Sequence, residues 1–220
     1  MSGKRAESIA DARRRRVLMA LAGLLVPASP LAARLLQVTP RQTAGPFYPV
    51  ELPLDDDNDL TRVSGRAERA AGRISDLDGR LLDVNGRTLP GLRVEIWQCD
   101  ANGHYHHPRD PGRGEPDPNF QGHGRTVTDG DGRYRFRTIR PVPYPGRTPH
   151  IHLAVFRDGA EPFTTQVYVA GEPRNDTDWI YQRIPAELRP RVTAEFMPAG
   201  GAGTELRASF DVVLGALPAA

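Results

Sequence analysis

The sequence is poor in cysteine, in long apolar runs and in basic patches, and each shortage limits what the chain can be. One cysteine, Cys99, among 220 residues cannot close an intramolecular disulfide, even in an oxidising compartment. The apolar run 17–26 is too short to span a bilayer comfortably. Beyond residue 33 no basic patch with interleaved aromatic residues occurs, so nucleic-acid binding has no support.

The first 33 residues do contain a targeting pattern. Four consecutive arginines at 13–16 run into the apolar stretch 17–26 and then into a small-residue end. This arrangement fits a twin-arginine signal, which exports folded proteins that often already carry their metal. We expect residues 1–33 to be such a signal, cleaved after Ala28 or Ala33, and the protein to be periplasmic or extracellular; a basic tail or an uncleaved anchor is the alternative. Removal of the segment leaves 23 basic and 25 acidic residues, so the net charge moves from +2 to −2.

Glycine and proline together make up nearly a fifth of the chain, with 22 Gly and 21 Pro, which favours short strands joined by many turns. Strands are predicted where apolar and polar residues alternate between turn signals. They are residues 80–84, 92–97, 133–139, 150–156, 165–169 and 208–214. One short helix is predicted around 185–188. Residues 34–220 are therefore expected to form one all-β domain, a single antiparallel β-sandwich with little helix.

Three segments lack a strand pattern. Residues 42–49 form an extended, turn-rich arm in this interpretation. Residues 99–124 contain Gly, Pro, Asp and His with almost no apolar side chains, which predicts a long loop, and long loops in compact domains are usually functional. The acidic segment 55–59 has the spacing that begins a calcium-binding EF-hand loop, but the required glycine and closing glutamate are missing, so a solvated loop is the better interpretation.

The candidate chemistry centres on two histidines, His150 and His152, in a predicted strand. Because side chains alternate across a strand, both histidines share one face and the apolar residues beside them face the core. Their Cα atoms should lie ~6.6 Å apart, at ~3.3 Å per residue, so both rings can converge on one metal. Tyr144 and Tyr105 can complete a set of four, in which phenolate oxygen suits a hard cation such as ferric iron. The pair alone could also be two polar residues on a half-exposed strand.

The sequence resembles the intradiol ring-cleavage dioxygenases, and among them the protocatechuate 3,4-dioxygenase type. The resemblance covers most of the chain after residue 42 and rests on several motifs in order, which together are specific. They are Gln42-Thr-Ala-Gly-Pro-Phe-Tyr-Pro49, Leu89-Pro-Gly-Leu-Arg-Val-Glu-Ile-Trp-Gln98, Phe120-Gln-Gly-His-Gly-Arg125, Thr128-Asp-Gly-Asp-Gly-Arg-Tyr134, Ile139-Arg-Pro-Val-Pro-Tyr-Pro145 and Thr165-Gln-Val-Tyr168. The resemblance implies an enzyme that uses O2 to cleave a catechol-type ring between its two hydroxylated carbons, giving a muconate-type dicarboxylic acid.

The resemblance also assigns roles to single residues. It implies four protein ligands for one mononuclear non-haem ferric ion, Fe(III): Tyr105, Tyr144, His150 and His152. Tyr144 would be the ligand that leaves the iron when the catechol binds. Arg147 would stabilise negative charge on the ring, and Gln166 would orient solvent at the metal. Read from the residues alone, Arg147 could instead form a surface salt bridge and Gln166 could point outward from its strand.

Other residues near these motifs have plainer interpretations. His104, His106 and His107 surround Tyr105 and could offer a competing metal site, but solvated loop histidines are the simpler expectation. Trp97 and Cys99 are expected in the core. Trp179 and Tyr181 are candidates for the mouth of the pocket.

Two other functions stay open at this point. One is a non-catalytic, transthyretin-like β-sandwich binding module of the cell envelope. The other is a zinc hydrolase built on the two histidines, which ranks last because no nearby glutamate is placed as a general base. In the leading interpretation the partners are a catechol-type substrate and O2, with no nucleic acid and no stable membrane insertion after signal removal. The protein would be a homo-oligomer or would assemble with a related subunit.

Overall fold

The structure is a computed structural model that describes residues 35–52, 55, 57–110, 114–199 and 206–215. The chain divides into two units, Met1–Ala33 and Arg34–Ala220, and every described residue belongs to the second. The predicted export signal therefore lies outside the described residues. Among the described residues, no helix is both long enough and apolar enough to cross a membrane.

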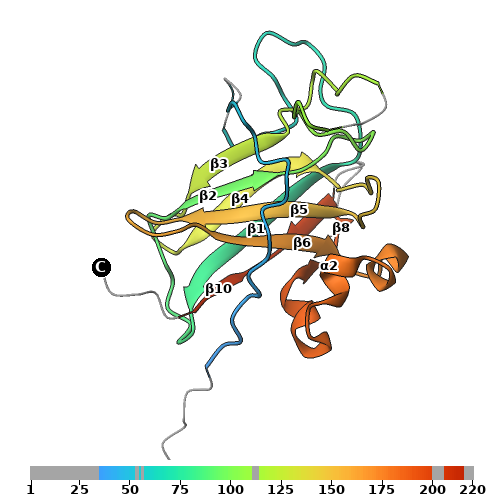
Figure 1. Cartoon of the computed structure of the whole chain (residues 1–220). Helices are drawn as coiled ribbons and strands as arrows, with labels where there is room; N and C mark the ends of the chain where they lie inside the picture. The colour runs from blue at the N-terminus through green and yellow to red at the C-terminus, as the bar shows by residue number, and fades with distance from the viewer. Residues whose placement is uncertain (1–34, 53–54, 56, 111–113, 200–205, 216–220) are drawn as a thin grey trace, which may run out of the picture. The chain divides into compact units, whose positions relative to one another are not determined.

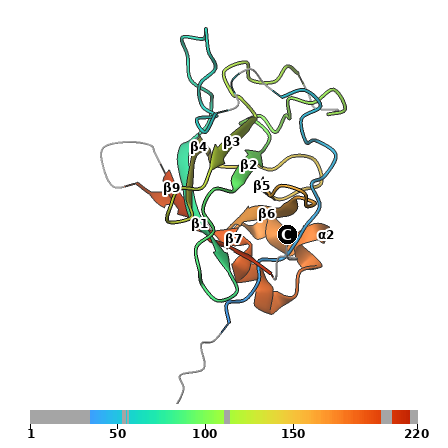
Figure 2. The same cartoon turned by 90° about the vertical axis from the view of Figure 1, so that its left-hand side faces the viewer.

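Two five-stranded sheets form the described unit (Figures 1 and 2). The first has the order β10-β1-β9-β8, with β4 also paired to β1. Its strands are β1 (Ile74–Asp83), β4 (Arg133–Ile139), β8 (Met197–Pro198), β9 (Leu206–Ser209) and β10 (Val212–Leu214). The second has the order β3-β2-β5-β6-β7. Its strands are β2 (Arg93–Trp97), β3 (His123–Val127), β5 (His150–Phe156), β6 (Phe163–Val169) and β7 (Thr193–Ala194).

The prediction of an all-β sandwich with little helix is confirmed. Most strand pairs are antiparallel, whereas β1 with β9, β1 with β10 and β6 with β7 run parallel, so both sheets are mixed. The helical elements in the described unit are short: η1 (Pro173–Asp176), α2 (Trp179–Gln182) and η2 (Ala186–Arg191). The helix predicted around 185–188 is the 3-10 helix η2. Neither η1 nor α2 was predicted.

The main core lies between the two sheets and follows the alternation in the sequence. In β4 Tyr134 and Phe136 are buried, while Arg133 and Arg135 are exposed. In β5 the residues Ile151, Leu153 and Val155 are buried in the same core, as the pattern predicted. Complete burial of an aliphatic side chain contributes about 1.5–3 kcal/mol, so this face of β5 strongly fixes how the strand sits.

Strand boundaries differ from the predictions at both ends of the domain. β1 begins at Ile74, six residues before the predicted start at 80. The prediction missed the first half of this strand because polar and apolar residues alternate less clearly there. The predicted strand 208–214 is split into β9 and β10, which both pair with β1. Between them the Asp211 side chain accepts a hydrogen bond from the Arg80 backbone N–H at 2.9 Å, in place of a backbone carbonyl. β3 begins inside the predicted loop 99–124.

The extended arm crosses the outer face of the second sheet over β5 and β6 (Figure 1). At the start of the arm, Gln42 N–H donates to the Thr164 carbonyl of β6 at 2.8 Å. Just before the arm, Thr39 N–H donates to the Val213 carbonyl of β10, in the first sheet, at 2.9 Å. Under the arm lies a second, smaller core. It contains Trp97, Cys99, Tyr105 and Ala154, packed against Ala44, Phe47, Tyr48, Val142, Tyr144 and Phe156. The candidate site is built at the edge of this second core.

Candidate metal centre

His150 and His152 lie on the face of β5 that points away from the main core and toward the arm. Each is 1% exposed, and His152 lies in register between Trp97 of β2 and Gln166 of β6. The Nδ1 of His150 is 2.7 Å from the Thr148 carbonyl, and a carbonyl can only accept, so Nδ1 carries the proton. In the neutral ring Nε2 is therefore free to coordinate, and it lies 3.3 Å from Nε2 of His152.

A tight turn places Tyr144 beside Arg147. Pro145 and Gly146 occupy the middle of the turn, Gly146 has φ +80°, and the Arg147 N–H donates to the Tyr144 carbonyl at 3.0 Å. Proline followed by glycine with positive φ is typical of a type II turn. The turn brings Arg147 Nη1 to 3.3 Å from Tyr144 Oη. The local sequence thus fixes this tyrosine and arginine as neighbours.

The buried carboxylate of Asp100 shapes the loop that positions Tyr105. Its Oδ1 accepts hydrogen bonds from the backbone N–H of Asn102 at 2.8 Å and of His104 at 2.9 Å. Its Oδ2 accepts from the Asp117 N–H at 2.7 Å, which ties the two ends of the loop together. Sequence reasoning missed Asp100, although Asp followed by Asn-Gly two residues later is a known signal for such a turn.

The four predicted ligands form a closed ring of neighbouring side chains. Ring centroids lie 5.3 Å apart for Tyr105 and Tyr144, 5.5 Å for Tyr144 and His150, 4.8 Å for His150 and His152, and 6.3 Å for His152 and Tyr105. The residues come from three separate segments: the loop after β2, the turn before β5, and β5 itself. The structure therefore brings together all four residues that the sequence singled out.

Both histidines are neutral at pH 7. Burial, assisted by the positive charge of Arg147, lowers the pKa of His150 to about 3. Burial, followed by the neighbouring His150 and Arg147, lowers the pKa of His152 well below its usual range. Neutral imidazole is the form that coordinates metal ions.

The two tyrosines differ in their surroundings. Burial raises the pKa of Tyr105 well above its usual value, and within the described part of the chain its Oη lacks a hydrogen-bond partner of acceptable geometry. Burial also raises the pKa of the half-buried Tyr144, but the charge and hydrogen bond of Arg147 oppose this. A buried phenol oxygen without a partner is unfavourable unless something binds it. A trivalent cation would satisfy it and hold both tyrosines as phenolates.

The donor set therefore fits a hard metal ion. Two phenolates would supply the negative charge, and two neutral imidazoles would supply nitrogen donors. Across the residues that the structure describes, no group of three or more His, Cys, Asp or Glu side chains offers an alternative metal site.

Arg147 and Gln166 lie beside this ring of four. The Arg147 side chain is only 8% exposed, and its Nε pairs with Asp178 Oδ2 at 2.8 Å, so the interaction is a buried ion pair and not a surface one. Arg147 Nη2 donates to Gln166 Oε1 at 2.6 Å. Gln166 is fully buried, and its Nε2 donates to the Thr43 carbonyl of the arm at 3.0 Å. Gln166 thus lies on the same face of the sheet as His152, and because the arm covers it, it is not an outward, solvated residue.

His152 is held between Trp97 and the arm. The indole of Trp97 stacks on the imidazole with centroids 4.8 Å apart and planes 2° apart. On the arm Gly45 has φ +68°, and a Cβ built there would lie 3.4 Å from His152 Cε1. The prediction that Trp97 is buried is confirmed, but the tryptophan is also a wall of the site, which the sequence did not indicate.

An open cleft of about 510 Å³ borders the site. Its lining comes from the loops after β2 and β4 and from the η1–α2 segment: Asn102, Pro143, Tyr144, Pro145, Gly146, Arg147, Thr148, Arg174, Thr177 and Asp178. Trp179 is 55% exposed, and Tyr181 packs against Tyr168 with centroids 4.8 Å apart. Neither lines this cleft, so the structure does not place them at its mouth.

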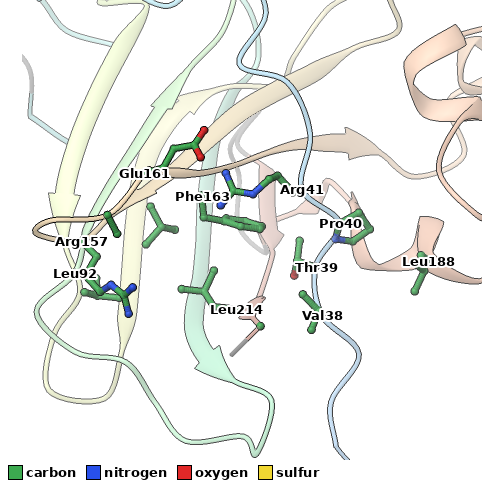
Figure 3. A pocket seen from close by; sticks show the side chains of 13 residues that line it. Val38, Thr39, Pro40, Arg41, Leu92, Arg157, Glu161, Phe163, Leu188 and Leu214 are labelled. Carbon is green, nitrogen blue, oxygen red and sulfur yellow. The ribbon is translucent and has the colours of Figure 1, made fainter. Parts of the chain in front are cut away.

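A second cavity, of about 610 Å³, lies by the turn between β5 and β6, at the opposite end of β5 from His150 (Figure 3). Its lining includes Val38, Phe163 and Leu214 and none of the predicted site residues.

Of the three histidines around Tyr105, only His106 matches the expectation of a solvated loop residue. His104 and His107 are buried, while His106 is exposed. His107 Nδ1 accepts a hydrogen bond from the Arg109 N–H at 3.1 Å, so it helps to shape the loop. Cys99 is buried as predicted, and burial raises the pKa of its thiol to about 12.

Comparisons with known proteins give a matching family model and several similar proteins. A family model described as Dioxygenase matches residues 43–216. The chain is 41% identical over 131 residues to the beta chain of protocatechuate 3,4-dioxygenase from Burkholderia cepacia, which covers 55% of each chain. It is 36% identical over 111 residues to catechol 1,2-dioxygenase from Acinetobacter baylyi, which covers 42% of this chain and 35% of the relative. The chain thus spans about half or less of the length of these curated relatives.

A solved structure extends the similarity to most of the chain. The dioxygenase domain of a dioxygenase carbohydrate-binding protein fusion from Streptomyces sp. SirexAA-E superposes with a TM-score of 0.64 at 29% identity. The superposition covers 82% of this chain and 100% of that domain.

Proposed function

The chain belongs to the intradiol ring-cleavage dioxygenase family, and from that membership we propose that it is a ferric dioxygenase acting on a catechol. The reaction would use O2 to cleave the ring between its two hydroxylated carbons and give a muconate-type dicarboxylic acid. The observation that carries the proposal is the closed ring of two tyrosines and two histidines, with a buried phenol oxygen that lacks a partner among the described residues.

The residues proposed to hold a mononuclear non-haem Fe(III) are Tyr105, Tyr144, His150 and His152. Ferric iron bound there would act as a Lewis acid, drawing electron density from a catechol dianion so that the ring reacts with O2. Two phenolates balance most of its charge, which supports the ferric over the ferrous state. The four proposed iron ligands include no aspartate or glutamate.

Tyr144 and Tyr105 are proposed to have different tasks. Tyr144 is half-buried and lines the cleft, whereas Tyr105 is 3% exposed and packed under Phe47 at 4.8 Å. An incoming catechol can therefore reach Tyr144 first and would pass one of its two hydroxyl protons to the Tyr144 phenolate oxygen and the other to solvent. Tyr105 would remain a fixed ligand. This difference in exposure supports the role of Tyr144 as the releasable ligand.

Arg147 is proposed to stabilise negative charge on the ring. Its Nη1 lies 3.3 Å from Tyr144 Oη and 3.5 Å from His150 Nε2, so a positive charge sits at the edge of the donor set. A fixed, largely dehydrated charge of this kind acts most strongly on charge that develops during reaction. Gln166 would orient solvent in the site through an N–H of its amide: Arg147 Nη2 donates to its Oε1 and one N–H of its Nε2 donates to the Thr43 carbonyl, which leaves the second N–H of Nε2 as a donor for solvent.

Two further proposals concern the whole protein. The similarity to a beta chain supports assembly with a related subunit or with further copies of itself. The arginine-rich start and apolar run of residues 1–33 support export by the twin-arginine route.

The experiment that tests the enzyme proposal uses the full-length, iron-loaded protein. We expect a visible phenolate-to-iron absorption band and oxygen uptake with at least one of protocatechuate, catechol, hydroxyquinol and chlorinated catechols. Tyr105→Phe and Tyr144→Phe should each alter the band, while Tyr181→Phe, a buried tyrosine outside the ring of four, should not. An unchanged band in both ligand variants would show that the assignment is wrong. A colourless protein without oxygen uptake would favour the binding-module alternative.

A further inference from the structure

Asp178 is a buried carboxylate that no motif in the sequence indicated. Its side chain is fully buried and accepts four hydrogen bonds within the described unit. Oδ1 accepts from the N–H groups of Ile180 and Tyr181 at 3.0 and 2.9 Å, which caps α2. Oδ2 accepts from Arg147 Nε at 2.8 Å and from the Thr148 N–H at 2.9 Å. Oδ1 thus caps α2, and Oδ2 binds the turn that carries Arg147.

Two nitrogens of the Arg147 guanidinium are held by hydrogen bonds, and the third faces the candidate site. Nε is held by Asp178, and Nη2 is held by Gln166 Oε1 at 2.6 Å. Nη1 remains, and it faces Tyr144 Oη and His150 Nε2 at 3.3 and 3.5 Å. A guanidinium is a rigid planar fork, so two acceptors on different edges fix the direction of its third nitrogen.

A neighbouring contact strengthens the same link. Thr148 Oγ1 donates to Asn175 Oδ1 at 2.8 Å, and Asn175 Nδ2 donates to the Val169 carbonyl at 2.9 Å. The segment η1–α2 is therefore attached to the turn before β5 at two points, Asn175 and Asp178. Arg174 and Thr177, on the same segment, line the cleft.

We propose that Asp178 is a positioning residue, which holds the guanidinium of Arg147 with Nη1 directed at the proposed ring-cleavage site. The inference rests on the function proposed above for that site. Without the carboxylate, a buried positive charge would lose its countercharge, and Arg147 would turn toward the solvent of the cleft. Through Asp178, the η1–α2 segment would control the orientation of a residue that acts on the substrate.

The test variant is Asp178→Asn, which is nearly isosteric. Its amide oxygen can still cap α2, but its NH2 would face the donors of Arg147 and Thr148, so the change acts mainly on the arginine side. The matched control is Asp176→Asn, which makes the same change of charge two residues away on the exposed surface of η1.

The first measurement does not depend on activity. Exchange of the Arg147 Nε–H with solvent is followed by 15N NMR on the full-length protein, metal-free and with diamagnetic gallium(III) in place of iron. We expect exchange at least about tenfold faster in Asp178→Asn than in the wild type, because the hydrogen bond that protects this proton is lost. Asp176→Asn should match the wild type. Unchanged exchange in Asp178→Asn would overturn the proposal.

The second measurement is a kinetic double-mutant cycle on the iron-loaded protein. Asp178→Asn should lower kcat about tenfold with a much smaller change in KM, because the lost interaction matters most as charge develops on the ring. In an Arg147→Gln background the same substitution should change kcat by no more than about twofold, since the residue it positions is gone. Equal losses in both backgrounds would show a merely structural role and would also overturn the proposal. If the wild type cleaves no catechol, the proposed function fails and the exchange measurement alone decides.

Discussion

Acid should destabilise the metal-free chain through the same two histidines that form the candidate site. His150 and His152 are buried as neutral imidazoles, and their folded pKa values lie far below those of an exposed histidine. In the unfolded chain each would bind a proton near pH ~6.5. The folded chain does not, so the unfolded state gains stability as protons become available.

The sign and size follow from linkage. The unfolded state binds more protons between about pH 6.5 and the folded pKa of His150, about 3, so the stability is fully present above the upper limit and is lost as the pH falls through this window. Between pH 7 and pH 5 a single histidine of this kind removes about 2 kcal/mol from the free energy of unfolding, and two remove about 4 kcal/mol. For a domain of ordinary stability this is a large fraction of the total.

The assay is urea unfolding of the full-length, metal-free protein at pH 7 and pH 5. The wild type is compared with His150→Gln, His152→Gln and the double variant, because glutamine is polar but does not titrate. Each single substitution should reduce the loss of stability between the two pH values by about 2 kcal/mol, and the double substitution by about 4 kcal/mol. If the double variant loses as much stability as the wild type over this range, the histidines are not buried as neutral groups, and the electrostatic account of the site is wrong.

Two further predictions concern the arm and the proposed export signal. Gly45→Ala should lose about 1 kcal/mol of stability from its positive φ. It should also retain less iron, because the strain lies where the arm touches His152, although the new methyl group itself would make only ordinary van der Waals contacts, 3.4 Å from His152 Cε1 and 3.8 Å from Nε2. Gly171→Ala, at φ +69° with open space around it, should lose similar stability by urea unfolding and keep its iron; equal iron retention in the two variants would contradict the role of the arm. Replacing Arg14 and Arg15 with lysine should leave the precursor in the cytoplasm of a bacterial host with an active twin-arginine system, as followed by cell fractionation. Undiminished export would contradict the signal assignment.

The sequence indicated much of the fold because the strands alternate clearly. In β5 the alternate residues Ile151, Leu153 and Val155 are apolar and buried, and in β4 Tyr134 and Phe136 follow the same pattern, so the type of element and its buried face could be predicted directly. β1 was found only in part, since its first half is interrupted by acidic residues. The helices η1 and α2 are too short to show a periodic apolar pattern, so they could not be predicted from the local sequence.

From the residues alone, only those parts of the candidate site that a short sequence pattern builds could be predicted. The Pro145-Gly146 turn and the two-residue spacing of the histidines act over a few residues, and both could be interpreted from the sequence. Asp178 pairs with Arg147 across 31 positions, and Trp97 reaches His152 only through pairing of β2 with β5. Such contacts depend on how separate segments meet in space, and a single sequence does not encode them in any local pattern.

The candidate metal site and the main core are nevertheless specified by the same feature, the alternation along β5. Shifting the strand by one residue would move His150 and His152 into the main core and place Ile151 and Leu153 under the arm. That arrangement would give up about 1.5–3 kcal/mol for each aliphatic side chain and would bury two imidazoles among apolar residues. The apolar face therefore does more than stabilise the sandwich. It fixes the register that turns both imidazoles toward Tyr105 and Tyr144, and a substitution that weakens packing at Ile151 would loosen the ligand set without touching any member of it.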